Sequence, residues 1–357
     1  MKFFVSTGEV SGDLHLSYLV KAMLEQNKDL KFYGAAGNHS RAQGVEVIQD
    51  IEELAIMGFT EVFKKYSFLK KKANEYIDFI KKEKIDKVIL VDYGGFNLKF
   101  LELLKKEAPE VEVFYYIPPK LWIWGEKRIT KLVKADHIMV IFPWEVDFYK
   151  KHGVDAVYFG NPFVDKYSVI ERTGNNILLL PGSRKQEIRT LIPIMLKVVE
   201  KKKDETFLLK LSSSDHLKWI DEDLNKYKNL KIVSDKSLAE CVKESKTAVA
   251  ASGTVTLELA LMGIPVIVVY RTSFINAFIA RHILKVGFVS LPNLTLNREV
   301  YPELLQEKCN PEEIEKYLDY FENSKEKIAE DIAEVRKKLS GKDVVKSYGN
   351  FLIRGEQ

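Results

Sequence analysis

The chain has 357 residues, of which 46% are hydrophobic and 30% are charged. This balance is typical of a folded globular protein, and it excludes a wholly disordered chain, a collagen-like chain and a polytopic membrane protein. The 55 Lys and Arg residues exceed the 51 Asp and Glu residues by four, an excess too small to indicate a nucleic-acid partner. The length suggests two domains. The two cysteines, Cys241 and Cys309, fit no metal-ligand spacing.

Two apolar stretches are candidates, one for a signal peptide and the other for a membrane-spanning segment. Residues 1–8 contain too short an apolar run for a signal peptide, so we expect a cytoplasmic chain. Residues 247–270 are long enough to span a bilayer and contain one charge, Glu258. Because Gly253 and Gly263-Ile264-Pro265 interrupt this stretch, we interpret it as a buried strand, a helix and a second buried strand.

Short apolar runs alternate with amphipathic helical patterns along most of the chain. Many of these runs lack alternating polar residues, which indicates strands covered on both faces, as in parallel sheets flanked by helices. The sequence therefore predicts an α/β protein with parallel sheets, and two such halves meeting at a cleft would place ligand loops at the carboxyl ends of their strands. The predicted strands are Lys2–Ser6, Lys87–Val91, Val111–Tyr116 and His137–Phe142, then Asn176–Leu180, Thr206–Leu211, Leu230–Val233, Thr247–Ala251 and Pro265–Val269.

The domain boundary is expected near the polar segment 171–176, because a new apolar strand starts directly after it. We predict a first domain over residues 1–170 and a second domain over residues 171–310. Residues 311–357 are charged and largely helical in pattern. They would pack back on the first domain or on a partner subunit, which makes a homodimer possible.

In the first half, acidic and glycine-rich segments follow two predicted strands. Gly8-Glu9-Val10-Ser11-Gly12-Asp13 follows the first strand, and Asp92 directly follows Lys87–Val91. A carboxylate at the carboxyl end of a parallel strand faces the ligand crevice, where it can accept a proton from a sugar hydroxyl. The structural alternatives are a helix N-cap for Asp13 and an Asx turn for Asp92.

In the second half, the corresponding segments have the composition of anion sites. Pro181-Gly182-Ser183-Arg184 and Ser252-Gly253-Thr254 each join a strand to a helix. Small residues at a helix N-terminus let backbone amides approach a phosphate, and Arg184 can bind it with two nitrogens. Neither segment matches a P-loop. Glu258, one turn further on, is better suited to accept hydrogen bonds from sugar hydroxyls.

A lysine-rich amphipathic segment is the candidate membrane surface. Five apolar residues recur at helical spacing beside Lys64, Lys65 and Lys70 to Lys72, and a helix of this kind can lie on an anionic membrane. An ordinary core-facing helix with a solvated lysine face is the alternative. A similar stretch covers residues 274–284. The residues proposed to face acyl chains are Phe59, Val62, Phe63, Tyr66 and Leu69.

Taken in order, the motifs resemble those of the lipid-A-disaccharide synthase family. At Gly94 and Gly95 the chain departs from the family pattern, which has a proline and an acid there. The matching motifs are Gly8-Glu9-x-Ser11-Gly12-Asp13, Met57-Gly58, Asp92 with Phe96-Asn97, Pro119-x-x-Trp122-x-Trp124, Phe142-Pro143-x-Glu145, Gly160-Asn161-Pro162, Leu180-Pro181-Gly182-Ser183-Arg184-x-x-Glu187, Ser252-Gly253-Thr254-x-Thr256-Leu257-Glu258, Gly263-x-Pro265-Val266, Leu291-Pro292-Asn293 and Pro302-Glu303-x-x-Gln306.

The resemblance implies a GT-B fold, in which two Rossmann-like parallel-sheet domains face each other across a cleft. It also implies an inverting glycosyl transfer that needs neither a metal nor a cofactor. The enzyme would move 2,3-diacylglucosamine from its UDP donor to the 6-hydroxyl of 2,3-diacylglucosamine 1-phosphate, giving a β-1,6 disaccharide and UDP at the inner-membrane surface. Catalytic roles would fall to Asp92, Glu9 and Arg184, with either acid as the base. The expected nucleotide-sugar contacts are Gly182, Ser183, Arg184, Ser252, Gly253, Thr254, Glu258, Asn293 and Gln306.

Two other functions stay open on the sequence. A UDP-sugar 2-epimerase or another GT-B sugar enzyme would share the nucleotide-binding half but would not need the lysine-rich segment. A peripheral membrane protein that binds nucleotide-linked lipids without turnover would not need acids in its cleft. The six histidines show no metal-binding spacing, so no metal site is predicted.

Overall fold

The computed structural model describes residues 1–52, 62–123, 125–272 and 287–355, and the side chains of residues 62–66 lie outside this description. The chain divides into two compact units. The first unit combines Met1–Asp165 with Gly341–Gln357, and the second contains Lys166–Ser340. The predicted ranges 1–170, 171–310 and 311–357 differ from this division, because residues 311–340 stay with the second unit and only the last segment returns to the first.

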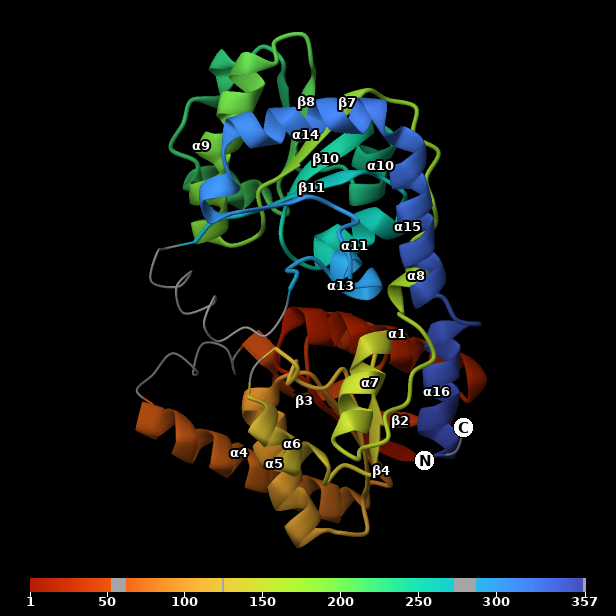
Figure 1. Ribbon diagram of the computed structural model, residues 1–357. Coiled ribbons are helices and arrows are strands. Elements are labelled where there is room, and N and C mark those ends of the chain that lie inside the picture. The colour runs from red at the N-terminus through yellow and green to blue at the C-terminus, as the bar shows by residue number, and fades with distance from the viewer. Residues whose placement is uncertain (53–61, 124, 273–286, 356–357) are drawn as a thin grey trace. The chain divides into compact units, whose positions relative to one another are not determined.

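The first unit is an alternation of strands and helices. Its strands are β1 (Lys2–Ser6), β2 (Lys31–Ala36), β3 (Val45–Asp50), β4 (Lys87–Val91), β5 (Glu112–Tyr116) and β6 (His137–Met139). Its helices include α1 (Val10–Gln26), α2 (Asn38–Arg41), α4 (Val62–Glu83), α5 (Gly94–Glu107), α6 (Ile129–Leu132), α7 (Pro143–Lys151) and α16 (Val344–Arg354), and α8 (Phe163–Lys166) lies at the boundary (Figure 1).

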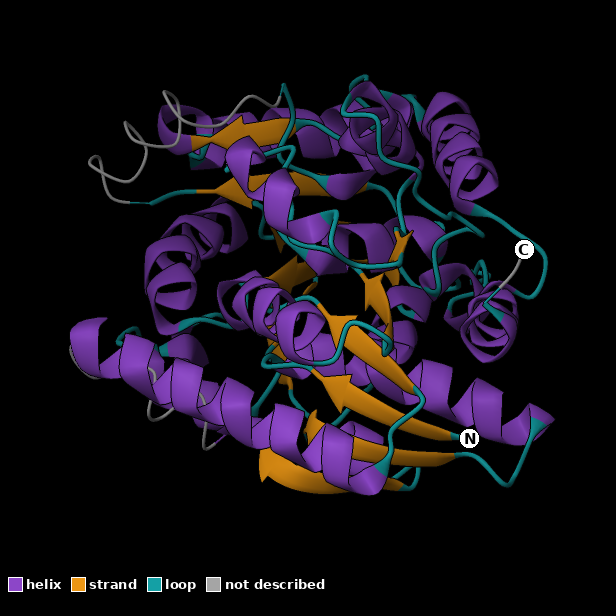
Figure 2. Ribbon diagram, turned by 90° about the horizontal axis from the view of Figure 1, so that it is seen from below, coloured by secondary structure: helices purple, strands orange, loops and turns teal. Residues whose placement is uncertain are grey.

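The six strands of the first unit form one parallel sheet in the order β3-β2-β1-β4-β5-β6. Figure 2 shows these strands side by side, with helices packed over the sheet. This is the strand order of a dinucleotide-binding fold, and its switch point lies between β1 and β4, where the direction of the strand order reverses.

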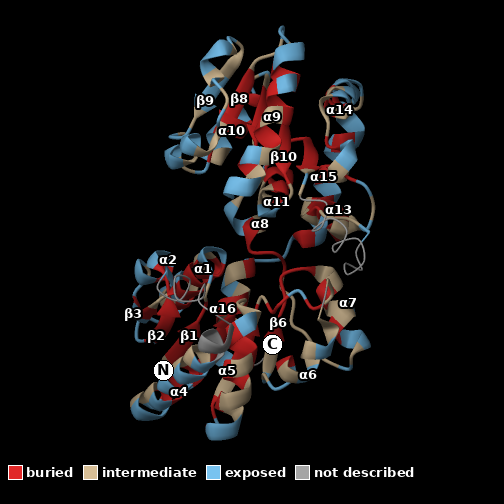
Figure 3. Ribbon diagram, turned by 90° about the vertical axis from the view of Figure 1, so that its left-hand side faces the viewer, coloured by how far each residue is buried: buried red, intermediate tan, exposed pale blue. Residues whose placement is uncertain are grey.

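Helices cover both faces of this sheet. Phe4, Leu90 and Tyr115 belong to a core cluster that includes residues of α4 and α5. On the other face, Phe114 and Tyr116 contact the aromatic rings of α16, which packs on α1. Burial on both faces explains why the central strands lack polar alternation, and Figure 3 shows the buried residues concentrated in these strands.

The last helix, α16, completes the first unit. The buried Tyr348 hydroxyl contacts the carbonyl oxygens of Val140 and Gly160. At the other end of α16, the Lys87 ammonium donates to the carbonyl oxygens of Leu352 (3.2 Å) and Ile353 (3.1 Å). A cation on the last carbonyls of a helix stabilises its C-terminus.

The second unit repeats the same plan. Its strands are β7 (Asn176–Leu180), β8 (Phe207–Lys210), β9 (Leu230–Val233), β10 (Ser245–Ala251), β11 (Val266–Tyr270) and β12 (Glu303–Leu305). Its helices include α9 (Lys185–Lys201), α10 (Leu238–Lys243), α11 (Thr254–Leu261), α13 (Leu291–Leu296), α14 (Pro311–Asn323) and α15 (Lys325–Leu339), with short 3₁₀ turns at Ser214–Trp219, Leu224–Lys226 and Gln306–Lys308.

The second sheet is also parallel, in the order β12-β11-β10-β7-β8-β9. Counted within the unit this is again the order 3-2-1-4-5-6, with the switch point between β7 and β10. The interpretation of residues 247–270 as strand, helix and strand is confirmed, since they form β10, α11 and β11. Among the described helices, none is both long enough and apolar enough to cross a membrane.

Candidate functional site

The predicted catalytic residues and six of the nine predicted nucleotide-sugar residues follow the strands at the switch points of the two sheets. In the first unit, β1 pairs with β4, so the segment that starts at Gly8 and the residue Asp92 follow adjacent strands at the same sheet edge. In the second unit, β7 pairs with β10, and the segments that start at Pro181 and Ser252 follow these strands. Ligands of open α/β sheets bind outside such carboxyl ends.

A strained turn presents Asp92. Asp92 and Tyr93 both have left-handed backbone conformations, with φ of 45° and 46°. An aspartate tolerates this region better than most residues, but the tyrosine beside it does so only where the surroundings hold it. The Asp92 carbonyl accepts hydrogen bonds from the Tyr115 hydroxyl (2.8 Å) and from the Asn97 amide (3.1 Å). These bonds engage the backbone carbonyl of Asp92 rather than its carboxylate, which accepts a hydrogen bond from the backbone of Tyr93.

Asn97 is the residue that locks this turn to the sheet. It is fully buried, and its Nδ2 also donates to the carbonyl oxygens of Ser6 (3.1 Å) and Val91 (3.2 Å). The Ser6 hydroxyl donates in return to Asn97 Oδ1 (2.7 Å). Asn97 therefore ties the ends of β1 and β4 together. The Phe96-Asn97 motif marked this position, but the sequence assigned it no role.

Burial raises the pKa of Asp92 to about 6, and the nearby Glu9 carboxylate raises it further, whereas Lys120 acts in the opposite direction. A carboxyl group with a pKa near 6 is largely ionised at neutral pH and is a stronger base than an exposed aspartate. Perturbation of this kind, in a group at the carboxyl end of a strand, marks Asp92 as a functional candidate.

The two other acids of the first segment have separate positions. Glu9 is exposed at the N-cap of α1, where its side chain makes no capping bond. Asp13 is buried, and its carboxylate accepts hydrogen bonds from the backbone amides of Gly37 and His39, both at 2.9 Å. Asp13 therefore caps α2 and not its own helix. The sequence suggested a capping role for Asp13 but could not indicate which helix it caps.

Two glycines allow the turn to pack closely. A Cβ atom on Gly8 would lie 2.3 Å from the ring of Tyr93, and one on Gly94 would lie 2.3 Å from Pro119. By contrast, a Cβ atom on Gly95 would meet nothing within 4 Å. At Gly94, where the chain departs from the family pattern, the glycine allows the backbone to pack closely against Pro119.

The first unit also contains a buried acid that the sequence did not select as a site residue. Glu145 accepts hydrogen bonds from Trp122 Nε1 and from the Phe142 amide, both at 3.2 Å. Burial raises the pKa of Glu145 to about 7, while Lys120 acts to lower it. Lys120 thus faces both perturbed acids, Asp92 and Glu145.

The second unit has a cavity of about 380 Å³ at its switch point. Six of the nine predicted nucleotide-sugar residues line it, together with Lys210 and Ser212, which the sequence did not identify. The N-termini of α9 and α11 border this cavity, and Gly253 at the N-cap of α11 has no side chain to cap it. Two helix N-termini at one cavity favour an anionic ligand. The six lining residues are Gly182, Ser183, Arg184, Ser252, Gly253 and Thr254.

In this structure an internal carboxylate lies against the first of these helix ends. Glu187 Oε2 accepts hydrogen bonds from the backbone amides of Ser183 (3.2 Å) and Arg184 (3.3 Å). The Arg184 side chain is 84% exposed and lies 3.4 Å from the same carboxylate. An exposed guanidinium with one weak partner can turn to an incoming phosphate at little cost.

The other three predicted nucleotide residues do not line the cavity. Asn293 is fully buried: its amide donates to Tyr301 and Glu303, and its oxygen accepts from the amides of Val300 and Tyr301. These four bonds use its whole hydrogen-bonding capacity, so it holds its loop. Glu258 accepts a hydrogen bond from the Tyr167 hydroxyl (2.7 Å).

Gln306 has a left-handed backbone with φ of 53°, and it accepts a hydrogen bond from the amide of Thr272. The loop that Asn293 holds is connected to the cavity through Ser252, whose hydroxyl donates to the carbonyl of Val289 (3.3 Å). Asn293 and Gln306 therefore belong to the frame around the cavity in this structure.

The predicted acyl-facing residues are mostly beyond what the structure describes. Phe59 lies outside the described residues, as do residues 274–284 and Trp124. Val62, Phe63 and Tyr66 fall in α4, but their side chains are outside the description. Leu69 is half-buried and packs against the core of the first unit. Within the described ranges, no three His, Cys, Asp or Glu side chains are grouped so that they could hold a metal ion.

Comparison with known proteins identifies similar chains over nearly the whole length. A family model described as lipid-A-disaccharide synthetase matches residues 3–352. The chain is 33% identical over 380 residues to the lipid-A-disaccharide synthase of Persephonella marina, a match that covers 98% of each chain. It is 36% identical to the enzyme of the same name from Myxococcus xanthus, over 88% of this chain and 86% of that one.

Solved structures resemble the fold at low sequence identity. A UDP-GlcNAc 2-epimerase from Neisseria meningitidis, bound to UDP-GlcNAc, matches over the full length of both chains with a TM-score of 0.66 and 12% identity. MurG from Acinetobacter baumannii matches 99% of each chain with a TM-score of 0.61 and 13% identity. These likenesses concern the fold alone, and together with the two strand orders they confirm the predicted GT-B fold.

Proposed function

The chain belongs to the lipid-A-disaccharide synthase family and is a glycosyltransferase, and from this premise we propose that Asp92 is its catalytic base. The reaction joins a 2,3-diacylglucosamine unit from its UDP donor to the 6-hydroxyl of 2,3-diacylglucosamine 1-phosphate. A base must remove the proton of that hydroxyl as its oxygen attacks the anomeric carbon. Attack on the face opposite the leaving UDP inverts the configuration.

Asp92 fits the base better than Glu9 does. Its pKa of about 6 leaves it ionised at neutral pH but basic enough to accept a proton in the transition state. Asn97 and Tyr115 hold the backbone that carries this carboxylate. The exposed Glu9 has no such support, and its charge contributes to the raised pKa of Asp92. We assign Glu9 to substrate positioning and to tuning of the base.

The UDP group binds in the cavity of the second unit, in this proposal. Its diphosphate would accept hydrogen bonds from the amides that begin α9 and α11, with Arg184 in place of the present contact to Glu187. These groups stabilise the negative charge that develops on the departing UDP, which is the task a metal ion performs in other transferases. Asn293 and Gln306 would hold the neighbouring loops, and Glu258 would bind sugar hydroxyls after exchanging its bond to Tyr167.

The lysines of α4 are proposed to hold the enzyme on an anionic membrane surface, because its substrates carry acyl chains. Lys70 and Lys71 are exposed, whereas Leu69 packs on the core. In the described part of α4, the contact would therefore be electrostatic.

The observation that carries this proposal is Asp92, a buried acid with a raised pKa at the switch point of one sheet, together with the anion-binding cavity at the switch point of the other sheet. The test is a detergent-micelle assay with both substrates and EDTA, read as UDP and disaccharide by mass spectrometry. Disaccharide formation should survive EDTA.

Asp92→Asn should lower kcat by at least 100-fold and leave UDP binding within twofold, since a base contributes roughly 10² to 10⁴ in rate. Asp78→Asn, on the exposed side of α4, is the matched control. A full rate for Asp92→Asn would assign the base elsewhere. Release of UDP without disaccharide would indicate hydrolysis or a different acceptor, and UDP binding without turnover would favour an epimerase or a binding protein.

A further inference from the structure

The second unit has another cavity, at the opposite edge of its sheet from the one assigned to UDP. Its volume is about 500 Å³. The amino ends of three strands contribute to it, through Ile177 at the start of β7, Thr247 near the start of β10, and Pro265 just before β11. The UDP cavity is lined instead from the carboxyl ends of β7 and β10. The two cavities share no lining residue, so this one is unused by the mechanism.

One part of the wall is apolar. Ile177, Leu318, Phe321 and Ile332 line it, and all four are buried. They come from β7, α14 and α15, and small residues between them, including Ala333, leave the space open. A cavity of this size with apolar walls falls within the range of small-molecule sites.

The rest of the wall is charged, with an excess of cations. Five basic residues and three acidic residues line the cavity, which gives a formal charge of +2. Lys202 pairs with Asp319 at 2.5 Å, and Lys246 pairs with Glu205 at 2.8 Å and with Glu322 at 2.6 Å. All three acids are thus engaged by two lysines. The remaining basic residues are Arg172, Lys325 and Arg336.

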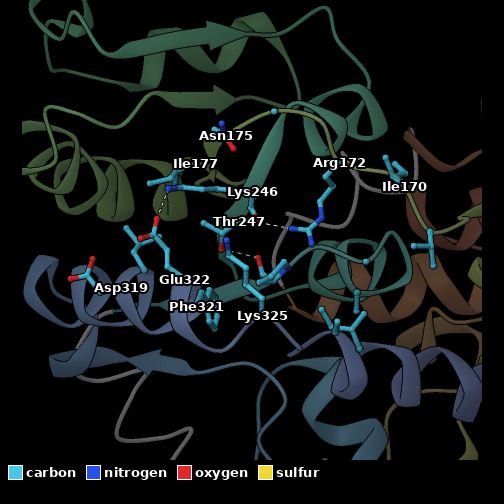
Figure 4. Close-up of a pocket in the computed structure, with 18 of the residues that line it drawn as sticks. Ile170, Arg172, Asn175, Ile177, Lys246, Thr247, Asp319, Phe321, Glu322 and Lys325 are labelled. Atoms are coloured by element: carbon cyan, nitrogen blue, oxygen red, sulfur yellow. Dashed lines mark hydrogen bonds and ion pairs between the residues drawn. The ribbon is translucent and has the colours of Figure 1, made fainter. Parts of the chain in front are cut away.

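Arg172 is placed to receive an anion. Its Nη1 donates to the carbonyl of Lys246 (2.5 Å), which orients the guanidinium while its other N–H groups stay available. Figure 4 shows Arg172 entering from one side of the cavity, with Lys246 and Glu322 on the other. A guanidinium fixed in this way binds a carboxylate or a phosphate with two nitrogens.

We propose that this cavity binds a single-chain amphiphile with an anionic head group. The head would lie against Arg172 and Lys325. The hydrocarbon chain would lie against the apolar lining side chains that solvent reaches, the half-buried Ile170 and Val169, which is 64% exposed. A neutral hydrocarbon would bring no charge to Arg172 and Lys325, and a short anion would leave Val169 and Ile170 in contact with water. Only a ligand with both features satisfies both parts of the wall.

The site also lies beside both places where the chain passes between the two units. Val169, Ile170 and Arg172 on its wall follow the first crossing at Asp165–Lys166, and α15 leads to the second at Ser340–Gly341. A bound amphiphile would thus touch both connecting segments. The proposal does not depend on the glycosyl transfer.

Binding is measured by calorimetry on the full-length protein with saturating UDP, so that the other cavity is filled. The probes are dodecanoate and dodecyl phosphate below their aggregation concentrations, 1-dodecanol as a chain without charge, and propionate as a charge without a chain. We expect one molecule of dodecanoate or dodecyl phosphate per chain, bound at least tenfold more tightly than dodecanol, and no binding of propionate. The tighter of the two anions identifies the head group.

Variants locate the binding. Ala333→Trp fills the cavity from the surface of α15 and should abolish binding, while Lys325→Gln and Arg172→Gln should each weaken it about five- to tenfold. Lys337→Gln is the matched control, because Lys337 lies on α15 but does not line the cavity, and it should change the affinity less than twofold. The thermal midpoint of each variant verifies folding, and unchanged UDP affinity separates this result from any failure of the proposed function. Full affinity in Ala333→Trp, or equal affinity for dodecanol, would overturn the proposal.

Discussion

At the scale of single residues, the most consequential feature is a carboxyl group that the fold prefers to keep neutral. Burial raises the pKa of Asp92 from 3.8 to about 6. Because the folded chain favours the protonated form of Asp92, this group stabilises the fold at low pH. That contribution to the free energy of unfolding is lost as the pH rises through 6. Asp92→Asn removes the ionisation but keeps the shape and tolerates the left-handed backbone. The raised pKa that suits Asp92 to accept a proton therefore lowers the stability of the folded chain at neutral pH.

We therefore expect Asp92→Asn to be more stable than the native chain at pH 7. The difference in free energy of unfolding should grow by about 2 kcal/mol between pH 4 and pH 7. Urea titrations of both proteins at the two pH values measure it. Asp78→Asn, which replaces an exposed acid, should show no such growth, and a constant difference for Asp92→Asn would mean that its pKa is not raised.

Gly8 offers a second test at this scale, because the absence of a side chain at this position lets the Tyr93 ring pack against it. Gly8→Ala would bring a Cβ atom to 2.3 Å from the Tyr93 ring and displace the turn that carries Asp92. We expect a loss of about 1–3 kcal/mol in stability and a lower kcat, with UDP binding unchanged. Tyr93→Ser in the same chain should restore part of the rate. Gly95→Ala, where the space is open, should be tolerated, and an equal loss there would refute the packing argument.

At the scale of elements, the sequence predicted the described strands except β2, which lies inside the first sheet, and the edge strands β3 and β12. The central strands β1, β4, β7 and β10 are buried on both faces and so appear as continuous apolar runs. The edge strand β3 alternates between buried and exposed residues, and β12 has three residues. In the sequence, neither strand can be distinguished from a loop unless the neighbouring strand is known.

The switch-point segments were predicted for the same reason that the central strands were. Glycine, serine and acidic residues stand out when they directly follow an apolar run. Glu145 and Lys120 were not identified, because their relation to Asp92 depends on distant segments that pack together. The capping of α2 by Asp13 was out of reach for the same reason, since 24 positions separate Asp13 from Gly37.

For α4, the prediction concerns its lysines. Each exposed lysine near an anionic surface contributes about 1 kcal/mol, so Lys70→Gln and Lys71→Gln should each weaken binding to phosphatidylglycerol-containing vesicles about fivefold. Sedimentation with vesicles at low and high salt measures this, and high salt should reduce the effect. Lys228→Gln and Lys231→Gln, exposed in the second unit, are the controls. Equal losses in both pairs would place the membrane contact elsewhere.

At the scale of the whole molecule, the second unit is an insertion within the first. Residues 166–340 form their own sheet and core, whereas the first unit needs α16 from the far end of the sequence. The sequence identified helices after residue 311 but not where each belongs. An amphipathic pattern shows that a helix has an apolar face, and it does not specify which sheet receives that face.

This arrangement predicts that the second unit folds alone. A fragment of residues 166–340 should unfold cooperatively and bind UDP within about threefold of the full chain, measured by calorimetry. A chain ending at residue 340 should keep UDP binding but lose the first unit, because Phe114, Tyr116 and Lys87 lose their partners on α16. A truncated chain with two intact unfolding transitions would contradict this.

The position of α16 also sets the order in which the protein can be completed during synthesis. The ribosome releases residues 1–165 and then the whole of the second unit before Tyr348 and Phe351 leave the exit tunnel. Until then, one face of β5 lacks its aromatic cover and Lys87 has no helix end to bind. The nascent first unit therefore exposes apolar surface throughout the translation of the second, and this interval is when it is most prone to aggregate.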